Sequence, residues 1–87
     1  MYYYWPARKE LMKAILEALR FFDGEATTQM INAKVAELLA IPQEALELED
    51  ANSTGSAFSY KMRWARTELK SEGKITNPSR GVWKIIE

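Results

Sequence analysis

Apolar residues in the first quarter of the chain recur with the spacing of a helix. Their intervals are four, four and three residues, which puts them on one stripe of an α-helix. The stripe consists of Leu11, Ile15, Leu19 and Phe22. Pro6 suits the first turn, because an amide hydrogen has no helical acceptor there. We therefore predict a helix from about Pro6 to Phe22, ended at Gly24 by the left-handed conformation that closes many helices.

A second helical pattern follows in "EATTQMINAKVAELLAIP". Thr27 or Thr28 can cap this helix with a hydroxyl, and Pro42 stops it. The apolar residues expected on its buried face are Ile31, Val35, Leu38 and Leu39. Residues 41–50 can hold one further helical turn, and residues 50–56 are a polar loop by composition.

The third helical pattern covers residues 57–72, with Ser56 placed to cap it. Its inward stripe is spaced four, three and four residues and consists of Phe58, Met62, Ala65 and Leu69. A turn of about 100° per residue defines the opposite side. That outward row is polar and cationic and consists of Ser56, Tyr60, Arg63, Thr67 and Lys70. Gly73 ends the helix.

The pattern at the end of the chain predicts a β-hairpin. "KIT" begins a short strand, "NPSRG" is a turn of five residues, and "VWKII" is a strand with Trp83 and Ile85 on one face. The predicted fold class is mainly α with a small β-hairpin, namely a winged helix-turn-helix of three helices and a C-terminal wing. Residues 1–87 form one such domain, and residues 1–5, "MYYYW", form an aromatic N-terminal arm.

Composition and charge narrow the function. The chain has no cysteine and no histidine, which removes thiolate nucleophiles, the commonest zinc ligands and the usual proton shuttle. No apolar run approaches the ~20 residues of a membrane helix, and a cytoplasmic setting fits. The net charge of zero hides a segregation: +2 in residues 1–22, −6 in residues 23–50 and +4 in residues 51–87. The domain is expected to be a dipole, although ordinary solvated faces would look the same.

A winged helix with a cationic third helix predicts binding to double-stranded DNA. The third helix would enter the major groove, and the wing would reach the backbone or the minor groove. Hydroxyls and cations near these elements would contact phosphates or base edges. The predicted DNA-binding residues are Thr28, Ser56, Ser59, Tyr60, Lys61, Arg63, Thr67, Lys70, Ser79, Arg80 and Lys84.

For three side chains in this region the sequence also predicts a structural role as an alternative to a DNA contact. Arg66 lies about 80° from the centre of the buried stripe, so it borders the core or pairs with a carboxylate. Trp64 lies on a flank, where packing against the first helix or the hairpin is favoured over base contact. Trp83 is read as core, so that the tryptophans hold helix and wing together.

The stretch "YKMRWARTELKSEGKITNPSRGVW" also resembles the closing half of the N-terminal domain of Mrr-type restriction endonucleases. The matching residues are Trp64, Ala65, Leu69, Lys70, Gly73, Ser79, Arg80, Gly81 and Trp83. The resemblance implies a winged-helix module that binds DNA, methylated DNA included. In that family the module precedes a nuclease domain that cuts DNA carrying modified bases, and such a domain is not found in these 87 residues.

Catalysis by the chain itself is not expected. Two Glu-x-Lys triplets, at residues 68–70 and 72–74, resemble part of a nuclease metal site, but they fall at a helix end without an acidic partner on a strand. No metal or cofactor is therefore predicted. The alternative function is a protein-interaction module, with a homodimer formed through the arm, unless the arm folds back over its own core. The acidic residues 23–50 could instead bind a basic partner, although no motif supports this.

Overall fold

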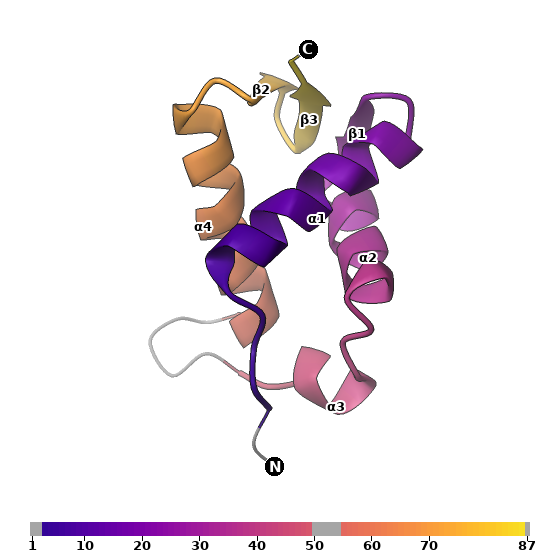
Figure 1. The fold of residues 1–87 in the computed structure, drawn as a ribbon, viewed down its shortest axis with the longest axis vertical. Helices are drawn as coiled ribbons and strands as arrows, with labels where there is room; N and C mark the ends of the chain where they lie inside the picture. Colours follow the sequence, from indigo (N-terminus) through magenta and orange to yellow (C-terminus); the bar gives the residue numbers. More distant parts are fainter. Residues whose placement is uncertain (1–2, 50–54, 87) are drawn as a thin grey trace.

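The computed structural model describes residues 3–49 and 55–86, which form a helical body capped at one end by a small sheet (Figure 1). In chain order its elements are α1 (Arg8–Phe21), β1 (Glu25–Thr27), α2 (Thr28–Leu38), α3 (Gln43–Leu46), α4 (Ala57–Ser71), β2 (Ile75–Ser79) and β3 (Val82–Ile85). The three long helices and the single turn after Pro42 agree with the predicted pattern. α1 begins two residues later than predicted, and residues 50–54 of the predicted loop lie outside the described residues.

The sheet has three strands where the sequence predicted two. Its order is β1-β3-β2, and both pairings are antiparallel, with Ala26 of β1 opposite Trp83 of β3. β1 was missed because three residues carry too little alternation to be recognised, and only pairing with β3 makes them a strand. The element order and this topology are consistent with a winged helix, so the predicted fold class holds.

The hairpin turn is tighter than the predicted five residues. β2 continues through Asn77 and Pro78, the pairing register shifts between Thr76 and Ser79, and the reversal occurs at Arg80 and Gly81. Pro78 is tolerated because β2 is an edge strand. The Asn77 amide donates to the carbonyls of Ser79 and Val82, which closes the turn from within.

All three long helices end in the same way. After each helix at least one residue has a positive φ, and the amide after the first such residue reaches back to a carbonyl inside the helix, as in a Schellman motif. The positive-φ residues are Asp23 (61°), Ala40 (51°) and Gly73 (77°), and the reaching amides are those of Gly24, Ile41 and Lys74. The sequence predicted this ending at Gly24 and Gly73, whereas at α1 the first left-handed residue is Asp23.

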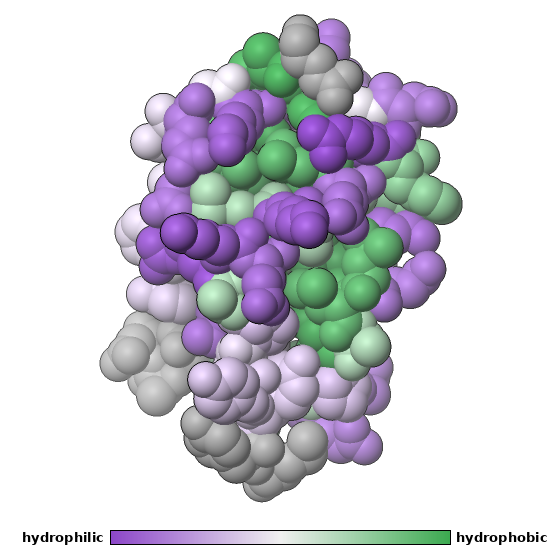
Figure 2. All heavy atoms as spheres, viewed as in Figure 1, coloured by the Kyte–Doolittle hydropathy of each residue, from purple (hydrophilic) through white to green (hydrophobic). Residues whose placement is uncertain are grey.

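The core lies between α1, α2 and α4 and is closed by the sheet. The predicted stripes of α1 and α4 are buried, apart from Phe22, which is half-buried. Leu38 was expected in the core but is 44% exposed. The chain leaves the helical path after Leu38, so that Leu39 and then buried Ile41 turn inward in its place. Figure 2 shows polar side chains over much of the face in front of α1, with apolar surface between them.

The described part of the N-terminal arm folds back over the core. Trp5 stacks on buried Phe58 with ring centroids 6.3 Å apart, and Tyr3 meets Trp5 edge-on at 4.9 Å. Tyr4 points away and is 85% exposed. Among the helices of the described residues, none is long and apolar enough to cross a membrane.

The equivalent positions Ala40 and Gly73 give a paired test of the helix ends. An L-residue is strained at positive φ and glycine is not, so Ala40→Gly should raise the free energy of unfolding, by about 1 kcal/mol at most. Gly73→Ala should lower it by a similar amount through backbone strain, because no atom lies within 4 Å of the added methyl group. Urea unfolding of the two variants measures both effects, and a loss of stability in Ala40→Gly would contradict the assignment.

Candidate nucleic-acid interface

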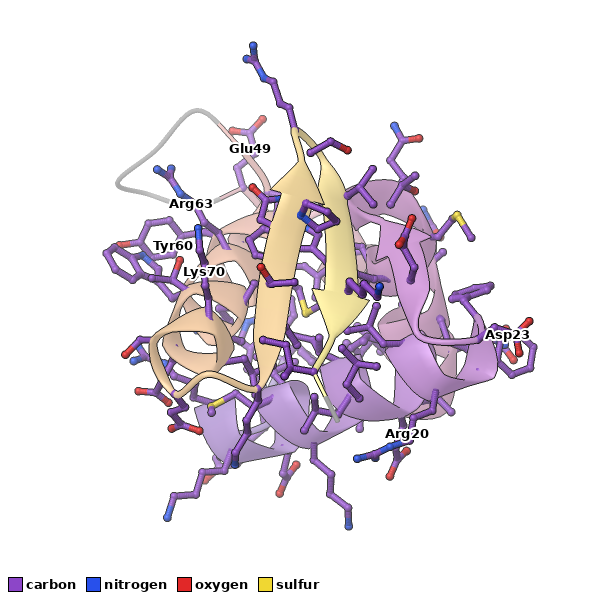
Figure 3. All side chains as sticks on the ribbon, turned by 90° about the horizontal axis from the view of Figure 1, so that it is seen from above. Arg20, Asp23, Glu49, Tyr60, Arg63 and Lys70 are labelled. Carbon is purple, nitrogen blue, oxygen red and sulfur yellow. The ribbon has the colours of Figure 1, made fainter. Side chains whose placement is uncertain are left out.

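The outward row of α4 is exposed as predicted apart from half-buried Ser56, but its members point in two directions. In Figure 3, where α4 is seen nearly along its axis, Arg63 and Lys70 extend toward the side on which the hairpin turn lies. Tyr60 extends away from the hairpin instead. Thr67 follows Arg63 by one turn and is exposed, as is Arg80 in the hairpin turn. The structure therefore brings Arg63 and Lys70 to the wing side of α4 and turns Tyr60 away from the hairpin.

The side of α4 away from the wing is aromatic. Tyr60 and Trp64 are 39% and 45% exposed, and their rings meet at 71° with centroids 6.3 Å apart. Trp64 was expected to pack under the first helix or the hairpin. It lies beside Arg8 and Leu11 at the start of α1, but nearly half of it remains open to solvent. Of the two tryptophans, Trp83 alone therefore links helix and wing.

Several predicted site hydroxyls already have partners within the protein. Ser56 caps α4 by accepting from the Ser59 amide at 3.1 Å, and it donates to the Ser59 hydroxyl at 2.9 Å. The Ser59 hydroxyl therefore keeps its own proton for an outside acceptor. Thr67 donates to the Arg63 carbonyl at 2.9 Å, so in this rotamer its oxygen can only accept.

Thr28 holds the wing to the start of α2. Its hydroxyl accepts from the Trp83 indole Nε1 at 3.1 Å and lies 3.5 Å from the Gly81 carbonyl, to which it donates. The Thr28 amide donates to the same carbonyl at 3.0 Å. The predicted phosphate contact at this helix start would break these bonds, so the position of Thr28 gives it a structural role. The hydroxyl that caps α2 is that of Thr27, which accepts from the Met30 amide at 3.2 Å.

Arg66 is the buried cation beneath the interface. Its Nη1 donates to the Asn32 side-chain oxygen of α2 at 2.9 Å, and its guanidinium lies 5.7 Å from the centre of the Trp83 ring. Burial, and then the positive charge of Arg63, lower the pKa of Arg66. Its Nε is buried and has no hydrogen-bond partner among the described residues. The sequence placed Arg66 at the core border, but no spacing links it to Asn32.

Two predicted contact lysines lie outside the wing side of α4. Lys61 extends toward the N-terminal arm, with Nζ 5.7 Å from the centre of the Trp5 ring. Lys84 of β3 lies opposite Glu25 of β1 in the antiparallel register, and it lines a hollow together with Arg20 and Asp23. Figure 3 shows Arg20 and Asp23 on the side of the molecule opposite Arg63. Periodicity could not show this, because the side that each element presents depends on its neighbours.

The Glu-x-Lys triplets do not assemble a metal site in the part of the chain that is described. Glu68 lies 3.7 Å from Arg8, and Glu72 lies 3.3 Å from Lys74. No group of three acidic, histidine or cysteine side chains able to hold an ion occurs among residues 3–49 and 55–86.

Replacing Arg66 should separate its structural role from that of its exposed neighbour. Arg66→Ala removes a part-buried, charge-assisted hydrogen bond and the contact with Trp83, and we expect it to lower the free energy of unfolding by about 2 kcal/mol. The control Arg63→Ala removes the same charge from an exposed position and should stay within about 0.5 kcal/mol of the original protein. Equal effects of the two changes in chemical denaturation would show that Arg66 does not hold the wing.

Comparison with known families agrees with this architecture. The sequence model of the Mrr N-terminal domain family matches residues 9–87, which confirms the resemblance seen in residues 60–83. Searches of curated proteins and of solved structures gave no match. The chain belongs to the Mrr N-terminal domain family, and is thus an N-terminal domain of the kind found in Mrr-type restriction proteins.

Proposed function

We propose that this domain binds double-stranded DNA, with α4 in the major groove and the hairpin turn against the backbone or the minor groove. The observation that carries the proposal is the exposure of Arg63 and Lys70 on the side of α4 where the hairpin turn lies. The major groove is about 12 Å wide and admits one helix. The 15 residues of α4 are about 22 Å long, enough to follow the groove for several base pairs.

The hairpin turn is well prepared to present Arg80. Asn77 closes the turn from inside, and Thr28 and Trp83 fix its base to α2. A turn that is already ordered loses less conformational entropy on binding, which favours affinity. Arg80 would then contact phosphate or the minor groove, with Ser79 beside it as a hydroxyl donor.

The net charge is zero, so support from charge is local to the exposed cations on the wing side. Glu44 and Glu47 lie on or directly after α3, at the end of the molecule opposite the sheet (Figure 1). The sheet end carries Lys70 and Arg80 together with the acidic residues Glu25 and Glu68, and Lys74 there pairs with Glu72. The attraction for a polyanion therefore comes at short range from the exposed cations and not from a dipole of the whole domain.

Not all predicted residues have the same part in this proposal. We assign duplex contacts to Ser59, Arg63, Thr67, Lys70, Ser79 and Arg80. Thr28 and Ser56 act indirectly, since they hold the wing and the start of α4 in place. Lys61 lies at the arm and Lys84 lies beside Arg20 and Asp23, so we assign neither of them to a duplex contact centred on Arg63. Tyr60 belongs with the aromatic side of α4.

Family membership suggests the setting in which such binding would be used. An N-terminal domain of a restriction protein that binds DNA would direct a separate catalytic part, so we assign binding and not cleavage to these residues.

Preference for methylated DNA is one form of the proposal. Titration of an isotope-labelled sample with matched unmodified and methylated duplexes tests it, with amide shifts expected in α4 and the wing.

Duplex binding is tested by removing the two arginines together. Arg63→Ala with Arg80→Ala should weaken binding to a 20-base-pair duplex and reduce the slope of log affinity against log salt by about two, since each lost phosphate contact removes roughly 0.9. Lys9→Ala with Lys13→Ala is the matched control, because it removes the same charge from exposed positions on α1. Fluorescence anisotropy at several salt concentrations measures both pairs. Equal losses in the two pairs would reject a contact surface on α4 and the wing.

A homodimer through the N-terminal arm is the alternative, favoured by the exposed ring of Tyr4. The packing of Tyr3 and Trp5 on the core leaves less aromatic surface for a partner. If the arm joins two copies, light scattering should show a dimer that becomes monomeric when residues 1–5 are deleted. A monomer before and after deletion would leave the arm with a packing role.

A further inference from the structure

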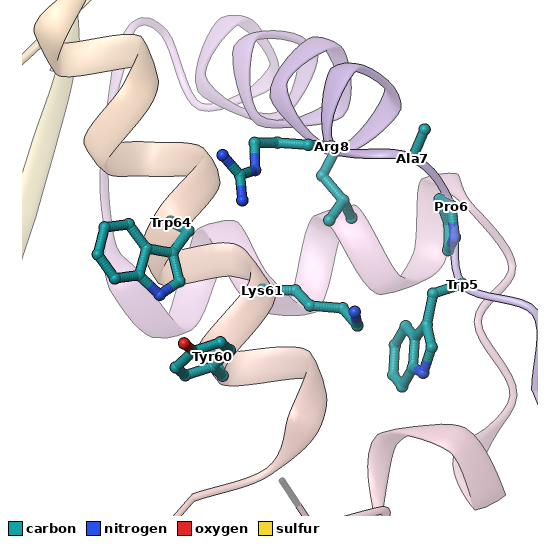
Figure 4. Close-up of a pocket in the computed structure, with 8 residues that line it drawn as sticks. Trp5, Pro6, Ala7, Arg8, Tyr60, Lys61 and Trp64 are labelled. Atoms are coloured by element: carbon teal, nitrogen blue, oxygen red, sulfur yellow. The ribbon is translucent and has the colours of Figure 1, made fainter. Parts of the chain in front are cut away.

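A groove separate from the wing side of α4 lies between the arm, the start of α1 and α4 (Figure 4). It has a volume of about 350 Å³, within the range of about 300–1,000 Å³ typical of sites for small ligands. Trp5 forms one wall, Tyr60 and Trp64 form the other, and Arg8 and Lys61 reach into the space between them.

The two walls differ in how firmly they are held. Trp5 is held by an edge-on contact with Tyr3 and by stacking on buried Phe58. Tyr60 and Trp64 contact each other edge to face, which leaves part of each ring open. Two large aromatic rings at this exposure on one helix have an unfavourable contact with water, which a planar ligand would relieve.

The cations make the groove suited to an anion. The Nζ of Lys61 has no carboxylate within 4 Å in the described residues, and it points along the face of Trp5 at 5.7 Å. Arg8 enters from α1 and is shared with Glu68 at 3.7 Å, where both side chains are about half exposed. An exposed ion pair of this kind is weak, so Arg8 can turn to a ligand anion at low cost.

Aromatic faces beside cations are the combination that binds unpaired nucleotides, since every base has a face to stack and every phosphate a charge to neutralise. An acidic peptide with an apolar side chain has similar chemistry. The nucleotide is favoured because the aromatic rings and the arginine of the duplex surface stand on the same helix, with Thr67 between them. An unpaired nucleotide next to a duplex bound at Arg63 would therefore meet this groove on the same helix.

We propose that the groove binds an unpaired nucleotide of single-stranded DNA, with the base stacked on Trp64 and Tyr60 and the phosphate held by Lys61 and Arg8. This inference rests on the proposed function and extends it, since it adds a second DNA structure to which the same domain binds. Single-stranded ends, bulges and displaced bases all supply such a nucleotide.

The probe is a fluorescein-labelled oligothymidine of eight nucleotides, compared with a blunt 20-base-pair duplex by anisotropy. Trp64→Ala should weaken oligothymidine binding about tenfold, the usual effect of removing one stacking ring, and change duplex binding less than twofold. Trp64→Phe keeps an aromatic face and should retain most of the affinity. Lys61→Gln should weaken oligothymidine binding and lower its salt dependence.

Each of the following results either supports or overturns binding of an unpaired nucleotide in the groove. No binding of oligothymidine by the original protein, or unchanged binding by folded Trp64→Ala and Lys61→Gln, overturns the proposal. Displacement of the oligonucleotide by an equal concentration of a glutamate-rich peptide carrying one tyrosine would also overturn it in favour of a protein ligand. Loss of duplex binding in the Arg63 and Arg80 variant, with oligothymidine binding intact, supports the two surfaces separately. If the original protein binds oligothymidine but not duplex, the duplex function fails and the groove stands.

Discussion

A buried guanidinium holds the small sheet of this domain against its helices. Arg66 reaches from α4 to the Asn32 amide on α2 and lies beside the indole of Trp83 on β3. The same indole donates to Thr28, which in turn holds the carbonyl of Gly81 in the hairpin turn. One connected set of contacts thus joins α4, α2 and the wing, the three elements whose relative position defines the interface. Because a buried cation without good partners is costly, this set also favours one arrangement over others.

The placement of Arg66 divides the surface of α4. With Arg66 turned under the wing, the residues around it on that side are Arg63 and Lys70, and the opposite flank is left to Tyr60, Trp64 and Lys61. The domain thus presents exposed cations on the wing side of α4 and an aromatic groove beside the arm. The first suits the regular phosphates of a duplex and the second suits an exposed base. In the proposed function α4 takes part in both contacts, because one of its flanks lies beside the wing and the other beside the arm.

The N-terminal arm has a larger part than its position suggests. Trp5 is half-buried and packs against the core through Phe58, and it is at the same time a wall of the groove. The family match begins at residue 9, so this wall precedes the matched region. The groove therefore combines residues of the family domain with a segment outside the match, whereas the wing side of α4 lies wholly within it.

The sequence alone determined that the long helices form and, for α4, where the helix is capped and where it ends, because these features depend on spacing within a few residues: the stripe from Phe58 to Leu69, the Ser56 cap and the Gly73 stop were all predictable. It placed the start of α1 two residues early and did not place the end of α2 at Leu38. It also predicted a core position for Trp83, which packs half-buried against the core, and placed Arg66 at the border of the core. It did not determine β1, the exposure of Leu38 and Trp64, the partner of Arg66 or the different directions of Tyr60 and Arg63. Each of these depends on which element lies opposite in space, through contacts between residues dozens of positions apart. Local periodicity describes what a helix can present, and tertiary packing decides which side is covered and which remains free to bind.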